Sequence, residues 1–285
     1  MAEAIHHTPK KTKKNRIKRS AVIATIGVAL LAGLVVTYLF FIKTDQEPMK
    51  TNQDVIINQN LPSEPAKKGV LKNLSGEEFR NLYNTFAYPN TEYISEDTVI
   101  TGDGDTDAHI QNLAEKRGYV RRSAPVSNVF KTVQKDMQLQ ERAATPWQEM
   151  QEAAKKDRIY LNLTAAYRSA NEQRQIFLER LGISAPNYKT IANGSYDGQI
   201  NQVLSMTAIP GYSRHHTGYT IDIGCENQPN VAFENTVCFD WLSADNYKNA
   251  KTYGFIPSYP EGAGKQGPEP ESWEYVWVGK ETLTE

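Results

Sequence analysis

The most informative part of this sequence is residues 213–224, which read SRHHTGYTIDIG. Apolar side chains alternate with smaller or polar ones from Tyr219 to Ile223, a pattern typical of a half-buried strand. The same run holds His215 and Asp222, and a strand there can direct both side chains at one metal ion. Zinc accepts both ligand types at about 2.0–2.2 Å, and a catalytic zinc keeps one position open for water. The alternative is a histidine near a turn and a solvated aspartate, because such pairs recur by chance.

Charge is distributed unevenly near the N-terminus. Residues 1–19 carry seven basic side chains and one acidic one, and residues 21–42 contain no charged side chain. The uncharged run is long enough to cross a bilayer as one helix, and the basic flank favours the cytoplasm. A cleaved signal peptide is the alternative, but its apolar region usually spans about 7–15 residues. We therefore expect a basic cytoplasmic tail at residues 1–20, a single transmembrane helix at residues 21–42, and an extracellular remainder anchored to the cell membrane.

The part after residue 42 is acidic. It holds 25 basic and 32 acidic side chains, a formal charge of −7. Nucleic-acid binding needs a basic face, so we expect no nucleic-acid partner. Residues 43–70 are rich in Gln, Asn, Pro and Lys and predict a linker. Residues 71–285 then remain for one domain.

Helix start signals occur at two places in this domain. Ser75 followed by Glu78 predicts a capping box. Asp103 predicts the cap of a helix that ends near Gly118, which we prefer to a calcium loop because the later ligands of an EF-hand do not follow. His109 is expected to be exposed on that helix.

Periodicity assigns the other elements. Residues 127–156 predict two amphipathic helices divided near Pro146, ahead of a strand at residues 159–164. Later segments predict a helix at 170–181 between Ser169 and Gly182, an irregular loop at 184–212, a helix at 241–250 and a strand at Phe255–Ile256. We therefore expect a single α+β domain, with helices packed on a small, mainly antiparallel sheet that carries the metal motif.

Four motifs in a fixed order resemble a known family. They are the Ser-x-His-x-x-Gly-x-x-x-Asp run that begins at Ser213, Ala166–Ser169 with Gln173, the segment from Trp241 to Pro260, and Glu271–Trp273. Together they resemble the VanY-type D-alanyl-D-alanine carboxypeptidases, a group that also includes LD-carboxypeptidases trimming peptidoglycan stems. The resemblance spans roughly residues 100–280.

The resemblance implies a role for each matched residue. His215 and Asp222 would bind zinc, and Glu271 would be the general base. Arg168 would receive the substrate carboxylate, for which the alternative is a surface ion pair. The other implied substrate contacts are Tyr167, Gln173, Ser213 and Trp273.

The third zinc ligand departs from the family pattern. That pattern resembles Glu-x-Trp-His-x-Arg-Tyr-Val-Gly, whereas this chain has Glu274 in place of the histidine and Val276 in place of the arginine. If Glu274 binds the ion through oxygen, two anions cancel its charge, so its water would be less acidic and manganese could compete. If it does not, the site has lost its metal. His109 is the remaining candidate for a substitute histidine.

The two cysteines, Cys225 and Cys238, follow the metal motif closely. In an exported protein this spacing favours a disulfide worth about 3 kcal/mol, whereas thiolate metal ligands are usually closer pairs.

The sequence thus predicts a zinc carboxypeptidase that removes the terminal D-alanine from peptidoglycan stem peptides by D,D- or L,D-cleavage. The alternatives are a catalytically silent peptidoglycan-binding module and a membrane-anchored protein that binds some other partner. Metal content separates the first two, since only the enzyme must hold an ion.

Overall fold

The computed structural model describes residues 69–93, 98–126 and 129–285. The basic tail, the uncharged run at 21–42 and nearly all of the predicted linker lie outside these residues. Among the residues that are described, no helix combines the length and the apolar character needed to cross a membrane. The membrane anchor and the extracellular location stay predictions.

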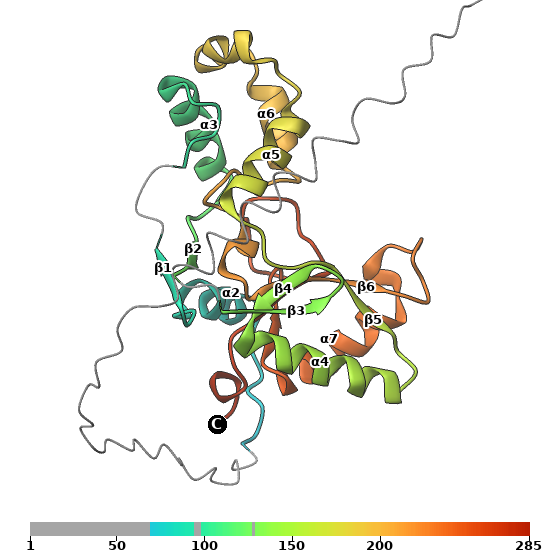
Figure 1. The fold of residues 1–285 in the computed structure, drawn as a ribbon. Helices are drawn as coiled ribbons and strands as arrows, with labels where there is room; N and C mark the ends of the chain where they lie inside the picture. The colour runs from blue at the N-terminus through green and yellow to red at the C-terminus, as the bar shows by residue number, and fades with distance from the viewer. Residues whose placement is uncertain (1–68, 94–97, 127–128) are drawn as a thin grey trace, which may run out of the picture. The chain divides into compact units, whose positions relative to one another are not determined.

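A four-stranded antiparallel sheet carries the metal motif (Figure 1). Its spatial order is β5 (Leu161–Ala165), β6 (Thr220–Cys225), β8 (Glu274–Trp277) and β7 (Phe255–Pro257). Two further pairings form two-stranded antiparallel sheets: β1 (Thr91–Tyr93) pairs with β2 (Ser123–Pro125), and β3 (Phe130–Gln134) forms a hairpin with β4 (Met137–Gln140). The predicted α+β fold with a small antiparallel sheet is confirmed.

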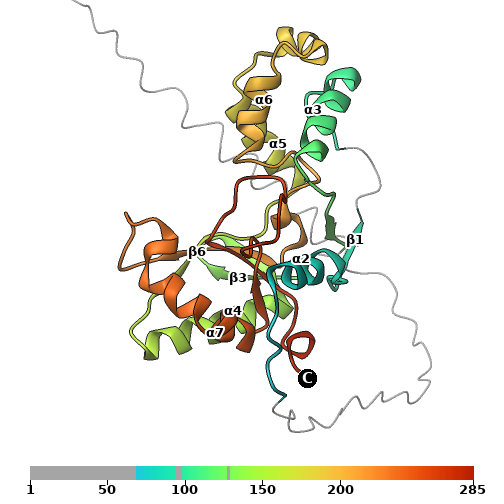
Figure 2. The same ribbon diagram turned by 180° about the vertical axis from the view of Figure 1, so that it is seen from behind.

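Helices fall into two groups, which Figures 1 and 2 show from opposite sides. The α-helices are α2 (Gly76–Thr85), α3 (Gly104–Lys116), α4 (Glu141–Lys156), α5 (Ala170–Leu181), α6 (Asp197–Leu204) and α7 (Val237–Thr252). The 3-10 helices are η1 (Ala185–Asn193), η2 (Arg214–Thr217), η3 (Phe233–Asn235) and η4 (Glu281–Leu283). Helices α2, α4 and α7 lie beside the sheet, whereas α3, α5, α6 and η1 form a separate helical group.

Each group has its own hydrophobic core. Trp147 of α4 and Leu242 of α7 are fully buried with Ile221 and Val276 of the sheet. The second core lies among the helices and is built from residues such as Ile110, Phe177, Ile200 and Leu204. Burial of these apolar faces stabilises each group by roughly 25 cal/mol per Å².

Local capping signals predicted three of the helix starts correctly, whereas the helix predicted at 241–250 begins earlier, at Val237. Ser75 and Glu78 form a reciprocal capping box at α2, and Ser169 with Glu172 forms the same motif at α5. Asp103 caps α3, as expected.

Residues 130–140 contradict the first of the two predicted helices. They form the β3–β4 hairpin, and only one helix, α4, follows. The apolar residues Val129, Val133 and Met137 are four apart, and four is also a multiple of the two-residue strand period. Pro146 lies in the second turn of α4, where its missing N–H removes one hydrogen bond without ending the helix.

Residues 184–212 are not the irregular loop that the sequence predicts. They contain η1 and α6, which pack against α3 and α5. Thr106 of α3 donates a hydrogen bond to the Tyr188 carbonyl at 2.7 Å, and His109 Nε2 lies 2.6 Å from Asp197 Oδ1. His109 is therefore half-buried and joins α3 to α6, rather than being exposed.

Helix α7 is interrupted in its middle. Asp245, Asn246 and Tyr247 have positive φ angles between 52° and 60°. The break turns the Asn246 amide toward α2, where it accepts from the Leu74 N–H at 3.0 Å and donates to the Leu74 carbonyl at 2.8 Å. These two bonds replace helical ones and hold the start of the described domain.

The predicted disulfide between Cys225 and Cys238 is present, and it joins the end of β6 to the first turn of α7. We predict that replacing both cysteines with alanine lowers the free energy of unfolding by about 3 kcal/mol, because the unfolded chain gains conformational freedom. Thermal unfolding with and without a thiol reductant checks this. The reductant should lower the melting temperature of the parent and leave that of the double variant unchanged; equal responses in both proteins would contradict the prediction.

Candidate metal centre

A 3-10 turn, not a strand, positions His215. Helix η2 ends at Gly218, whose φ of 74° favours glycine, and β6 begins only at Thr220. A Cβ at Gly218 would also lie 2.9 Å from a Phe130 ring carbon. The prediction that one strand carries both His215 and Asp222 is therefore wrong for the histidine, because the glycine turn folds it back over the strand that holds the aspartate.

Three side chains with metal-ligating atoms meet at this turn. His215 Nε2 lies 3.4 Å from Asp222 Oδ1 and 3.6 Å from Glu274 Oε2. Asp222 and Glu274 are directly opposite each other on β6 and β8. One ligand atom from each residue lies within 4.8 Å of the others. The structure thus places Glu274 beside His215 and Asp222. His109 instead pairs with Asp197 and is not part of this group.

The donor set fits a small divalent cation. Bonds of about 2.0–2.2 Å to a tetrahedral ion would put neighbouring ligand atoms about 3.3–3.6 Å apart. The two distances from His215 Nε2 lie in or near this range. Asp222 Oδ1 is buried without a hydrogen bond among the described residues, and a cation would satisfy it.

Crowded carboxylates control the electrostatics of the site. Burial alone would lower the pKa of His215, but the charges of Asp222 and Glu274 outweigh it and raise the pKa above its ordinary value. Burial, followed by the charges of Glu274 and Asp222, raises the pKa of Glu271 to about 8. A bound cation would relieve this repulsion.

Arg168 is held beside the metal-ligating group by its backbone and its side chain. Its N–H donates to the His215 carbonyl at 3.3 Å, and its Nη1 donates to Gln173 Oε1 at 2.9 Å. Gln173 is buried and donates its own amide to the Ala208 carbonyl at 2.6 Å. The glutamine is therefore oriented by α5 and the segment after α6, so that its oxygen fixes the guanidinium.

His216, which we did not assign to the site, braces this arrangement. Its Nε2 accepts from the Gly211 N–H at 3.0 Å, so its Nδ1 carries the proton and donates to the Arg168 carbonyl at 2.7 Å. Burial lowers the pKa of His216 to about 4, so the ring is neutral near pH 7. Its position next to His215 in the sequence was the available signal.

A cavity of about 1060 Å³ opens over these residues. It is lined by most of the residues predicted from sequence: Arg168, Gln173, Ser213, His215, Asp222, Glu271, Trp273 and Glu274. Tyr167 does not line it, because its ring packs on Phe130 with centroids 4.4 Å apart. The helical group and the segment after it also line the cavity, through residues such as Arg180, Gln199, Gln202 and Met206.

Arg214 is the second site residue that sequence reasoning missed. It is buried, lines the same cavity and contacts Glu274 at 3.2 Å. The ring centroid of Tyr259, which belongs to the motif from Trp241 to Pro260, lies 3.8 Å from its guanidinium carbon. Its place inside the metal motif was a signal for proximity, though not for this partner.

We predict that the metal-free protein loses stability as the pH rises from about 4.5 to about 8. The folded state holds a proton on Glu271 up to about pH 8, whereas the unfolded chain releases it near 4.5, so folding is progressively disfavoured across this window. The raised pKa of His215 acts in the same direction. Thermal unfolding in a chelator should show a flatter decline for Glu271→Gln than for the parent. An equally steep decline in both proteins would contradict the prediction.

Comparison with known proteins gives a consistent assignment. A family model described as VanY, D-alanyl-D-alanine carboxypeptidase, matches residues 136–280. A D-alanyl-D-alanine carboxypeptidase of Enterococcus faecalis is 29% identical over 139 residues, which are 48% of this chain and 47% of the relative. The chain thus aligns with less than half of that protein's length.

One further relative and one solved structure are similar to this chain. The bifunctional D-Ala-D-Ala dipeptidase and carboxypeptidase VanXYC of Enterococcus gallinarum is 29% identical over 149 residues, covering 50% of this chain and 69% of the relative. A solved structure of the D,D-pentapeptidase VanY from a VanB-type resistance cassette, in complex with Zn(II), is 22% identical, with a TM-score of 0.44 over 59% of this chain and 90% of that one. Because the family model matches half of the chain and spans His215, Asp222, Glu271 and Glu274, the protein belongs to the VanY family of D-alanyl-D-alanine carboxypeptidases.

Proposed function

We propose that this protein is a zinc-dependent carboxypeptidase that removes the C-terminal D-alanine from peptidoglycan stem peptides. The observation that carries the proposal is the meeting of His215, Asp222 and Glu274 in the cavity that also holds Arg168 and Glu271. Family membership and the activities named for the Enterococcus relatives support the same reaction.

His215, Asp222 and Glu274 would hold the ion. When bound, a divalent ion such as Zn²⁺ supplies a Lewis acid that polarises the scissile carbonyl and generates a nucleophile from water near neutral pH. The protein then needs a group that accepts the proton of the water and a group that binds the substrate's terminal carboxylate.

Arg168 is suited to the second task. A guanidinium binds a carboxylate through two parallel N–H···O bonds, and it stays charged at every relevant pH. Its bond to Gln173 Oε1 uses a neutral acceptor, so the positive charge is not cancelled by this partner. The free carboxylate of a terminal D-alanine supplies the opposite charge, so this pairing would favour a chain end over an internal bond.

Glu271 is suited to the first task. It lines the cavity, and the Glu274 N–H bonds to its backbone carbonyl at 3.2 Å, so it is held immediately before β8. A carboxylate there can accept a proton from water and pass it to the departing amine of D-alanine. A bound cation would relieve the repulsion that raises the pKa of Glu271 in the metal-free site, so that its carboxylate could accept a proton near neutral pH.

We predict that Glu271→Gln lowers kcat by about 10²–10⁴-fold without removing the metal, since general-base catalysis typically contributes that much. The assay incubates the zinc-loaded 285-residue chain with a stem pentapeptide and measures released D-alanine and bound zinc. Glu269→Gln is the matched control, because Glu269 lines the same cavity but is exposed and pairs with Arg117. A parent protein that binds the peptide but holds no zinc and releases no D-alanine would instead support the silent binding module.

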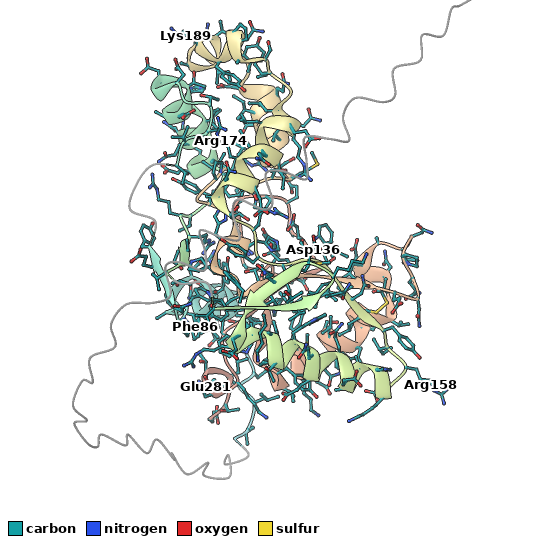
Figure 3. The ribbon with its side chains drawn as sticks, in the orientation of Figure 1. Phe86, Asp136, Arg158, Arg174, Lys189 and Glu281 are labelled. Atoms are coloured by element: carbon teal, nitrogen blue, oxygen red, sulfur yellow. A yellow bond between two sulfur atoms is a disulfide. The ribbon has the colours of Figure 1, made fainter. Side chains whose placement is uncertain are left out.

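We also predict that Arg168→Met raises KM by about tenfold or more, because a charge-assisted hydrogen-bond pair to the substrate is lost. The parent should discriminate strongly against a peptide with an amidated C-terminus, whereas Arg168→Met should treat the acid and the amide alike. Arg158→Met is the control, since Arg158 lies exposed just after α4 (Figure 3). Retained discrimination in Arg168→Met would show that another group reads the carboxylate.

A further inference from the structure

Arg214 is fixed beside the metal-ligating group by hydrogen bonds to Ser258, Gln266 and Glu274. Its Nη1 donates to the Ser258 carbonyl at 2.8 Å and to Glu274 Oε1 at 3.2 Å. Its Nη2 contacts the Gln266 carbonyl at 3.4 Å and the Gln266 side-chain oxygen at 3.3 Å. With 5% of its surface exposed, the guanidinium has one geometry and a buried charge.

Two aromatic rings hold the same guanidinium. The Tyr259 ring centroid lies 3.8 Å and the Tyr83 ring centroid 4.6 Å from the guanidinium carbon of Arg214. Arginine over an aromatic face gains cation–π attraction, which is stronger where water is excluded. Residues from α2 and from the segment after β7 therefore converge on Arg214, which lies between Ser213 and His215 of the metal motif.

The two oxygens of Glu274 face different partners. Oε1 accepts from Arg214, whereas Oε2 faces His215 Nε2 at 3.6 Å. Only 3% of Glu274 is exposed, and a carboxylate buried so deeply is strongly disfavoured unless it is paired. Arg214 thus neutralises the residue and leaves one oxygen directed at the metal-ligating group.

A charge count shows what the pairing achieves. A zinc ion with two neutral histidines and one aspartate has a net charge of +1, and a glutamate in place of one histidine reduces it to zero. Adding the buried charge of Arg214 returns the group to +1. Within this chain, the other charged groups near the set, Glu271 and Arg168, are the same whether residue 274 is a glutamate or a histidine.

We propose that Arg214 and Glu274 act as one unit that takes the place of a neutral histidine ligand. Arg214 is a positioning residue: it binds Oε1, presents Oε2 to the metal, and keeps the site positive enough to acidify its water. This rests on the proposed function, because it assigns Glu274 to the ion. The competing explanation is a purely structural ion pair that leaves the metal unaffected.

The test is a double-mutant cycle on the 285-residue chain with the variants Arg214→Met, Glu274→His and their combination, plus Arg214→Lys. Zinc affinity is measured by competition with a chromophoric chelator, and the pH profile of kcat/KM by D-alanine release. Glu274→His alone should bind zinc about tenfold or more weakly than the parent, because the charge of Arg214 then repels the ion at close range. Adding Arg214→Met to it should restore the affinity to about the parental value or tighter, since that set has the charge of two histidines and an aspartate.

The pH profile separates positioning from structural support. Arg214→Met should bind zinc at least as tightly as the parent, because the site is less positive. For the same reason, the acidic limb of its kcat/KM profile should shift to higher pH by about one unit. Arg214→Lys keeps the positive charge, so the acidic limb of its kcat/KM profile should stay at the parental pH. A purely structural ion pair would instead leave both the zinc affinity and the acidic limb of the pH profile unchanged in Arg214→Met.

The remaining outcomes also support or overturn the proposal. If Arg214→Met does not fold, the comparison of Glu274→His with the double variant and with Arg214→Lys still tests the charge relation. Equal zinc affinity in Glu274→His and the double variant would overturn the proposal. A parent that binds no zinc and releases no D-alanine would overturn the proposed function itself, whatever the variants do.

Discussion

The register between β6 and β8 is the constraint on which the site depends. Asp222 lies opposite Glu274, and Ile221 lies opposite Tyr275. Side chains directly opposite in an antiparallel pair share a face, so the two carboxylates meet on one side while Ile221 and Tyr275 are fully buried on the other. A slip of one residue would exchange these faces and expose the core residues, so the hydrophobic core also fixes the distance between the carboxylates.

Local signals predicted much of the fold because the physics involved is local. A capping box spans four residues, so Ser75 and Glu78 could be identified without knowledge of the rest of the chain. The β3–β4 hairpin and helix α6 were missed for the opposite reason. The spacing of apolar residues before Met137 suits both helix and strand, and α6 depends on distant partners such as His109. Short elements of this kind are stabilised mainly by tertiary contacts.

In the candidate site too, local sequence signals predicted some features, whereas contacts between distant residues could not be predicted. A motif with fixed spacing placed His215 and Asp222 together, and the order of motifs added Arg168 and Glu271 to the same cavity. The environment of Glu274 could not be inferred in this way, because its partner Arg214 is 60 residues away in sequence. The proposed pairing with Arg214 would offset the charge that Glu274 adds in place of a histidine.

The position of Tyr83 bears on where the functional unit begins. Its ring lies 4.5 Å from Arg122 and 4.6 Å from Arg214, and it belongs to α2, more than fifty residues before the segment that the family model matches. Tyr119 and Arg122, which line the cavity, also precede that segment. The segment that the family model matches therefore does not supply all of the residues that line the cavity. In this chain, residues before position 136 therefore shape the cavity, and replacing them would change its shape while leaving His215, Asp222 and Glu274 in place.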